Sequence, residues 1–173
     1  MVNILVGVSG SVAAIKIPEI LEVLSTVDNC HVKVVVTEHS RHFLPQDLTL
    51  LGNLCESVLT DEEEWTSWRQ RGDPVLHIEL RKWADIAIIA PLSANTLAKL
   101  SNGIADNLLT SVMRAWDFTK PCLIAPAMNT AMWEHPATNQ QLTILRTWGY
   151  TIIPPISKTL GKSMLLNYLF SSI

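Results

Sequence analysis

Short apolar runs alternate with segments of helical periodicity along most of the chain. The runs are rich in β-branched residues and span residues 3–8, 31–37, 85–90 and 122–125. Apolar residues at nearly every position of a run indicate strands covered on both faces. Between these runs, apolar residues recur at helical spacing in segments 11–24, 93–100, 106–116 and 137–148. The alternation predicts an α/β fold, a Rossmann-like (flavodoxin-like) three-layer sandwich with a parallel sheet.

The segment from about residue 45 to residue 72 breaks this pattern. It contains Gly52, the acidic run DEEE at 61–64 and two tryptophans, and it has no clean period. We expect a surface excursion here, with the acidic run on a solvated face or at a helix start.

Composition narrows the class of partner. The 173 residues are 48% hydrophobic and carry a net charge of −3, which favours one core and gives no basic patch for nucleic acid. Three cysteines, Cys30, Cys55 and Cys122, show no CxxC spacing and argue against disulfides or a zinc knuckle. The start MVNILVGV lacks a basic segment, and no apolar run nears the ~18 residues of a membrane span. We therefore expect a soluble cytoplasmic protein whose partner is a small molecule or another protein.

Residues just after each strand are the candidate binding residues, because open parallel sheets bind ligands at the carboxyl ends of their strands. Residues 7–11 combine glycines and hydroxyls at a predicted helix start, a setting that suits a phosphate. A plain strand-to-helix turn is the alternative. Ala13 stands where a dinucleotide fingerprint has its third glycine, which weakens a dinucleotide interpretation.

The other three loops also carry hydrogen-bonding side chains. After the second run, Thr37 and Ser40 offer hydroxyls, although an ordinary helix cap also explains them. The third loop, residues 93–96, has more polar groups than one cap needs, which indicates a ligand with several polar atoms. In the fourth loop, PAMNTAMW, the amide of Asn129 can bind a carboxylate, and an Asx turn or helix cap explains it equally well.

The histidines allow two kinds of site. His77 lies among alternating apolar residues in DPVLHIEL, where a lone histidine is more often structural than catalytic. His39 and His42 have i,i+3 spacing without a third ligand, so a metal site is the minor alternative and we expect no metal.

Taken in order, these segments resemble a known family. They are GSVAA, VVVTEHS, DPVLHIEL, APLSANTLAKLSNGIADNLLTSVMRAW and PAMNTAMWEHP. They are similar to the flavin mononucleotide (FMN)-dependent cysteine decarboxylases, which include eukaryotic phosphopantothenoylcysteine decarboxylases and halotolerance proteins. The resemblance covers about residues 3–158. It implies a flavin-binding decarboxylase domain at 1–158, with 159–173 a divergent or truncated tail of the same domain.

The resemblance also implies an activity. The family member would be a carboxy-lyase that converts 4'-phosphopantothenoylcysteine to 4'-phosphopantetheine in coenzyme A biosynthesis. It would form a homotrimer with FMN near the subunit contacts. In the family chemistry, flavin oxidises the cysteinyl thiol toward a thioaldehyde, which accepts the electrons released with carbon dioxide.

Each site residue receives a role from the same resemblance. Residues of all four loops would bind FMN: Gly10, Ser11, Val12, Thr37, Ser40, Ser93, Ala94, Asn95, Thr96, Ala127 and Met128. The essential histidine corresponds to His77, which would move a proton or orient the thiol. The substrate-binding asparagine corresponds to Asn129, which would hold the carboxylate with Met132 packed nearby.

The tail departs from the family pattern. In the family, the enethiol product of decarboxylation is finally reduced by hydride from the flavin and a proton from a cysteine. This cysteine lies in a glycine-rich flap after the last strand, whereas the present chain continues GKSMLLNYLF after Leu160. Three alternatives explain this tail. It is truncated, which impairs the final reduction; or it forms a terminal helix on the core; or the chain is an FMN-binding regulatory subunit. Outside the family, the alternatives are a nicotinamide-dependent dehydrogenase that uses Glu38 on a ribose and a protein with a core but no ligand.

Overall fold

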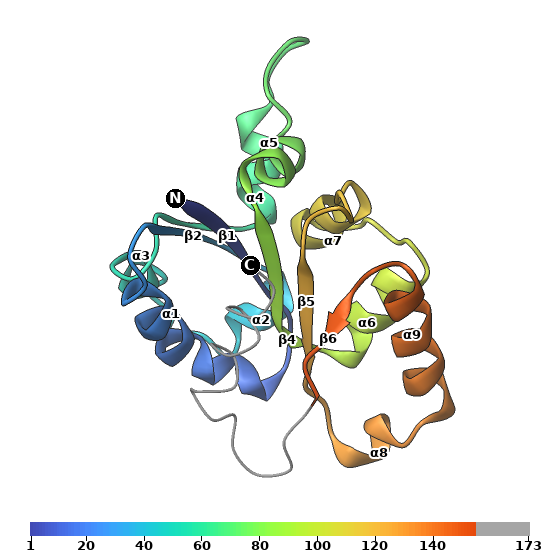
Figure 1. Cartoon of the computed structure of the whole chain (residues 1–173). Coiled ribbons are helices and arrows are strands. Elements are labelled where there is room, and N and C mark those ends of the chain that lie inside the picture. Colours follow the sequence, from blue (N-terminus) through green and yellow to red (C-terminus); the bar gives the residue numbers. More distant parts are fainter. Residues whose placement is uncertain (155–173) are drawn as a thin grey trace.

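One parallel sheet forms the centre of the molecule (Figure 1). The structure, a computed structural model, describes residues 1–154, so the tail after residue 158 and its three alternatives lie outside the described residues. Within the described range the strand order is β3-β2-β1-β4-β5-β6. The strands are β1 (Val2–Val8), β2 (Cys30–Val36), β3 (Ser57–Leu59), β4 (Ile86–Leu92), β5 (Cys122–Pro126) and β6 (Thr151–Ile152). This arrangement confirms the predicted parallel α/β fold.

The chain reverses direction across the sheet beside β1. From β1 it moves outward to β2 and β3, and then returns to β4, which pairs with the other side of β1. Such a reversal leaves a crevice between the carboxyl ends of the two central strands, where open α/β sheets bind ligands. The loops that follow β1 and β4 therefore border the expected binding position.

Helices cover both faces of the sheet (Figure 1). They are η1, a 3-10 helix (Val12–Lys16), α1 (Ile17–Ser25), α2 (Glu38–Arg41), α3 (Thr49–Gly52), α4 (Asp61–Ser67), α5 (Leu76–Trp83), α6 (Ala94–Ser101), α7 (Leu108–Arg114), α8 (Thr130–Trp133) and α9 (Pro136–Thr147). Ile4 and Val6 of β1 belong to the core shared with α1, whereas Leu5 belongs to the core shared with α6 and α7. Two buried faces explain why the strands have apolar residues at successive positions.

Residues 45–72 lie mostly at the surface as predicted, but they are also part of the sheet, which the prediction of a surface excursion missed. This segment supplies edge strand β3, whose Val58 pairs with Val34 of β2, and Leu51 of α3 is only 1% exposed. Its elements span three to seven residues, which is too short for a periodic pattern to show.

The helix expected at residues 11–24 is also divided. It begins as the 3-10 helix η1 and continues as α1, whose second residue is Pro18. Proline fits the first turn of an α-helix, because no intrahelical bond is lost there. Over residues 1–154, no helix has the length and apolar character needed to cross a bilayer.

Candidate active site

Hydrogen bonds through Ser9 join the loops after β1 and β4. The Ser9 hydroxyl donates to the carbonyl of Pro91 over 2.8 Å and accepts the N–H of Ser93 over 2.7 Å. Ser9 is completely buried, and these two bonds satisfy a hydroxyl that would be costly to bury alone. The first and third predicted binding loops therefore form one connected unit beside the sheet crevice.

The fourth loop belongs to the same unit. The Ser11 hydroxyl donates to the carbonyl of Ala127 over 2.9 Å, and the N–H of Ala127 donates to the carbonyl of Leu92 over 2.9 Å. Ser11 also precedes η1, where its side chain accepts the N–H of Ala13. Val12, the next predicted residue, keeps 64% of its surface exposed. The fold thus brings Ser11 and Ala127, 116 residues apart in the sequence, into direct contact.

The second loop contributes a close approach and an unpaired hydroxyl. A Cβ at Gly10 would lie 2.7 Å from the Cβ of His39, so this contact requires glycine. The Ser40 hydroxyl donates to the carbonyl of Thr37 over 2.7 Å. The Thr37 Oγ1 itself is buried and has no hydrogen-bond partner among residues 1–154. Because buried hydroxyls normally have a partner, this atom fits a polar cofactor such as the phosphate of FMN.

The third loop uses most of its polar side chains internally. The Ser93 hydroxyl accepts the N–H of Thr96 and donates to the Thr96 hydroxyl, both over 3.2 Å. Both residues are buried, so their first role is to begin α6. Asn95 is exposed, and its amide makes no hydrogen bond to a described residue. Asn95 is therefore the polar side chain of this loop that is open to a ligand.

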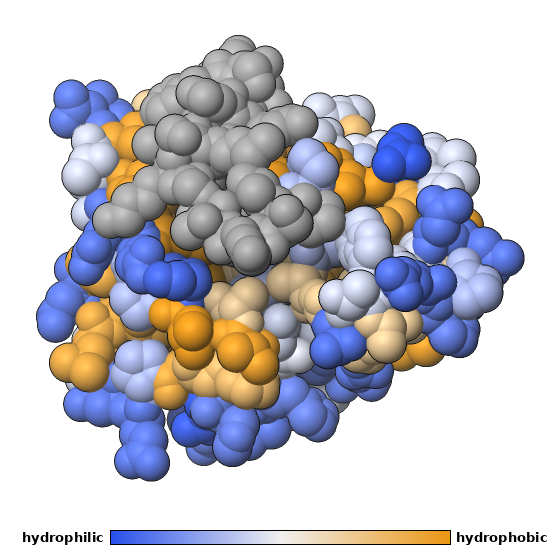
Figure 2. Space-filling view, turned by 90° about the horizontal axis from the view of Figure 1, so that it is seen from below, coloured by the Kyte–Doolittle hydropathy of each residue, from blue (hydrophilic) through white to orange (hydrophobic). Residues whose placement is uncertain are grey.

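Asn129 combines a structural contact with a free donor. Its Oδ1 accepts the N–H of Ala131 over 2.9 Å and caps α8, so the helix-cap interpretation is correct for the oxygen. The amide nitrogen has no partner in the described part of the chain and can donate to a carboxylate. Met132 is 50% exposed on the same short helix, while Met128 packs partly against the core. Figure 2 views this end of the molecule and shows hydrophobic surface beside hydrophilic surface.

A carboxylate that sequence reasoning missed holds His77. His77 lies in the first turn of α5, and its Nδ1 is 2.6 Å from Oε1 of Glu64. The backbone N–H of His77 donates to Oε2 of the same carboxylate over 3.1 Å. Glu64 is the last residue of the acidic run that was expected to be solvated, yet its side chain is only 12% exposed. The helix start expected there is correct, since Thr60 and Glu63 form a capping box before α4.

One chain does not bring His77 and Asn129 together. Asn129 follows the carboxyl end of β5, whereas α5, which carries His77, leads into the amino end of β4. In Figure 1, α4 and α5 lie at the top of the view and α8 lies at the bottom. Within one chain, the element that carries His77 therefore lies apart from the loop that carries Asn129.

Comparison with known proteins defines the family. The sequence profile named Flavoprotein matches residues 1–170. The chain belongs to this flavoprotein family. Over 159 residues the flavoprotein is 53% identical to phosphopantothenoylcysteine decarboxylase of Mus musculus, covering 91% of this chain and 75% of that relative.

Solved structures agree with this assignment. One is a PPC decarboxylase in which a cysteine is replaced by serine, in complex with pantothenoylaminoethenethiol. It has a TM-score of 0.91 and 45% identity, covering 98% of this chain and 97% of that chain. The FMN binding protein AtHal3 has a TM-score of 0.88 and 46% identity, with 97% and 95% covered. These likenesses confirm the family resemblance and the three-layer fold.

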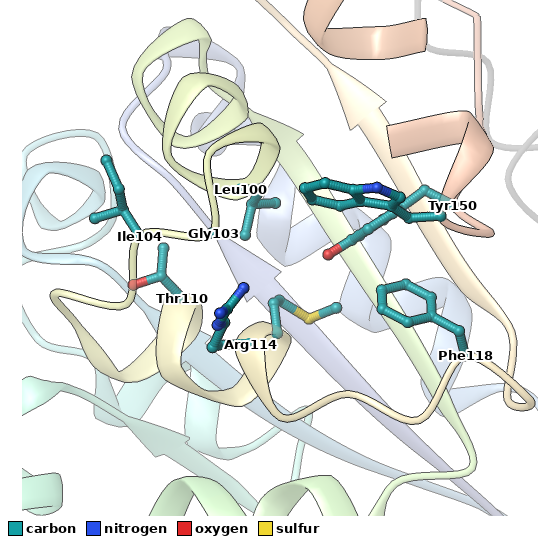
Figure 3. Close-up of a pocket in the computed structure, with 9 residues that line it drawn as sticks. Leu100, Gly103, Ile104, Thr110, Arg114, Phe118 and Tyr150 are labelled. Carbon is teal, nitrogen blue, oxygen red and sulfur yellow. The ribbon is translucent and has the colours of Figure 1, made fainter. Parts of the chain in front are cut away.

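A separate hollow in the flavoprotein lies between α6, α7 and the segment before β6 (Figure 3). Its lining residues are Leu100, Gly103, Ile104, Thr110, Met113, Arg114, Phe118, Trp148 and Tyr150. The predicted site residues are absent from this lining. The hollow is therefore distinct from the four binding loops.

The cysteines of the flavoprotein are poor candidates for an acid. Burial raises the pKa of the Cys122 thiol far above its ordinary value, and it also raises the pKa of Cys30 and Cys55. A thiol with a raised pKa gives up its proton less readily than an ordinary thiol, so it is a weaker acid. Over residues 1–154, no three His, Cys, Asp or Glu side chains gather in a way that could hold a metal ion.

Proposed function

We propose that this flavoprotein binds FMN and decarboxylates 4'-phosphopantothenoylcysteine, as a carboxy-lyase of coenzyme A biosynthesis. The observation that carries the proposal is the meeting of four polar loops at the carboxyl end of the sheet, beside the β1 and β4 crevice. Its support from relatives is the 53% identity to the mouse phosphopantothenoylcysteine decarboxylase. The AtHal3 structure, described as an FMN binding protein, supports the cofactor.

The four loops would hold FMN through both backbone and side chains. Gly10 gives the cofactor access to the backbone of the first loop, next to Ser11 and Val12. The Thr37 hydroxyl would donate to a phosphate oxygen, and Asn95 would bind a polar group from the third loop. The other contacts would come from Ser40, Ser93, Ala94, Thr96, Ala127 and Met128. Bound FMN supplies a two-electron oxidant for the cysteinyl thiol.

Asn129 and His77 would act on the substrate. The free amide nitrogen of Asn129 would donate to the substrate carboxylate, and the exposed Met132 side chain would cover it from water. A fixed carboxylate in a site that excludes water loses carbon dioxide more readily. His77 would take the thiol proton or orient the thiol through its Nε2.

We infer a homotrimer in which His77 of one subunit meets Asn129 of its neighbour near the flavin. His77 belongs to α5 and Asn129 caps α8, and these two helices lie at opposite ends of the molecule, which supports a shared site. Trp65 and Trp68, on and beside α4, are 80% and 51% exposed, which favours a protein contact close to His77. The number of three subunits is taken from the family resemblance. The cytoplasmic location is likewise a prediction from the sequence.

The final reduction of the enethiol is the step in which this chain departs most from the family pattern. The PPC decarboxylase structure with a cysteine replaced by serine contains pantothenoylaminoethenethiol, the unreduced enethiol. Residues 123–173 contain no cysteine, and the family's flap position after the last strand reads GKS at 161–163. We therefore propose that this chain releases carbon dioxide but reduces the enethiol poorly. The alternative function is an FMN-binding regulatory subunit.

An anaerobic reaction of the FMN-loaded protein with 4'-phosphopantothenoylcysteine tests these proposals. Carbon dioxide, flavin absorbance and product mass are followed together. Carbon dioxide with bleached flavin and a product two mass units below 4'-phosphopantetheine supports decarboxylation without final reduction. Full-mass product with reoxidised flavin would mean that another group replaces the cysteine. No carbon dioxide would contradict decarboxylation and favour the regulatory alternative.

A further inference from the structure

We propose that Glu64 is a positioning residue that fixes the tautomer and orientation of His77. The inference rests on the proposed function only for the role of His77 in the reaction. The contact between the two side chains can be tested without turnover.

The geometry determines which ring nitrogen carries the proton. An ionised carboxylate can only accept hydrogen bonds, and the 2.6 Å contact of Glu64 Oε1 is made to Nδ1 of His77. In the neutral imidazole, Nδ1 therefore holds the proton and Nε2 is the basic nitrogen. Nε2 makes no hydrogen bond to a described residue, so it is the atom that His77 can present to a thiol.

Both oxygens of the carboxylate are committed to the same residue. Oε2 accepts the backbone N–H of His77 while Oε1 accepts from the ring, so the ring and its backbone are fixed together. The side chains of Glu64 and His77 are only 12% and 25% exposed. Partial exclusion of water strengthens a hydrogen bond between them relative to one on the open surface.

The helix that carries Glu64 is itself anchored. Thr60 caps α4, and Oδ1 of Asp61 accepts the N–H of Leu108 at the start of α7 over 2.7 Å. Glu64 is thus placed by contacts that do not involve His77. The neighbouring Glu62 lies on the same helix, is exposed, and its side chain makes no hydrogen bond or ion pair with a described residue. Glu62 therefore provides a matched control for loss of one negative charge.

Nitrogen NMR of the FMN-loaded full chain tests the contact directly. Long-range proton–nitrogen correlations report which imidazole nitrogen is protonated, and the His77 signals are assigned by their loss in His77→Asn. We expect a protonated Nδ1 and a free Nε2 in the wild type. Glu64→Gln should abolish this preference, because an amide can donate to Nδ1 as well as accept from it. Glu62→Gln should leave the His77 signals unchanged.

Kinetics then measures the consequence. We expect the single-turnover rate constant for carbon dioxide release to fall about 10- to 100-fold in Glu64→Gln, since a positioned acid or base contributes about 10²- to 10⁴-fold. The substrate concentration that gives half the maximal rate and the FMN loading should stay the same, and Glu62→Gln should react like the wild type. A wild-type His77 with an unprotonated Nδ1, or a tautomer unchanged in Glu64→Gln, would overturn the inference. A wild type that shows the expected tautomer but releases no carbon dioxide supports the contact and defeats only the proposed function.

Discussion

Gly10 in the first loop and Thr37 in the second loop are constrained for different reasons. Gly10 is required because the backbone of the first loop passes against His39, where a side chain has no room. Thr37 is buried with a hydroxyl that finds no partner among residues 1–154, an arrangement that is unfavourable unless a ligand supplies one. Both constraints act on the proposed FMN site, the first through the path of the loop backbone and the second through a buried hydroxyl.

Substitution Gly10→Ala should weaken FMN binding by about 10-fold or more. The new Cβ would lie 2.7 Å from the Cβ of His39 and 3.3 Å from its carbonyl carbon, so the loop must shift. Fluorescence titration of the apoprotein with FMN measures the effect. Gly52→Ala is the control, because a Cβ there meets nothing within 4 Å. Equal FMN affinity for Gly10→Ala and Gly52→Ala would show that the close approach does not shape the site.

Replacement of His77 by asparagine should lower carbon dioxide release by about 100-fold or more. Asparagine removes the basic nitrogen, while the four proposed FMN-binding loops lie at the end of the molecule opposite α5 and should keep their cofactor. Anaerobic carbon dioxide release is measured on protein with wild-type flavin content. Undiminished release from such protein would remove His77 from the mechanism.

Whole elements differ in how much of them the sequence could predict. The strands β1, β2, β4 and β5 have five to seven mostly apolar residues, whereas β3 and β6 have three and two residues and leave no pattern. In α5, alternating apolar residues imitate a strand, but Leu76, Leu80 and Trp83 share the helix face that packs on the core. The polar residues after the long strands could be predicted, because the position of each strand also gives the position of the loop that follows it. The role of Glu64 could not be predicted, because only the packing of α4 on α5 brings it to His77.

At the carboxyl end of α5, Lys120 supplies a cap that stabilises the helix carrying His77. Its ammonium donates to the carbonyl of Ala84 over 2.6 Å and to that of Lys82 over 3.3 Å. Lys120→Met should lower the free energy of unfolding by about 1–3 kcal/mol, since bonds from a charged donor are lost. Urea denaturation measures this change. Lys82→Met, which removes an exposed pair with Glu79, should cost less than about 1 kcal/mol, and an equal loss in both variants would contradict the cap.

At the scale of the whole molecule, a parallel sheet separates the parts of the proposed site. The proposed FMN-binding loops and Asn129 follow the carboxyl ends of the strands, whereas α4 and α5, with His77, lie at the opposite end of the molecule (Figure 1). When one surface of a subunit binds a different surface of the next subunit and the ring closes, every subunit contacts one neighbour through each of the two surfaces. A homotrimer would then contain equivalent sites, each with His77 from one subunit and Asn129 from the next.

A mixture of two inactive variants tests this arrangement. His77→Asn removes the proton carrier, and Asn129→Asp places a negative charge against the substrate carboxylate, so each pure variant should be inactive. In trimers assembled at random from equal amounts, about one quarter of the interfaces combine an intact His77 with an intact Asn129. Co-expressed variants should therefore recover about one quarter of the wild-type rate of carbon dioxide release, in a particle about three times the 19.2 kDa chain mass. If both residues acted within one chain, no combination of these subunits would contain a complete site, and the mixture would stay as inactive as its components.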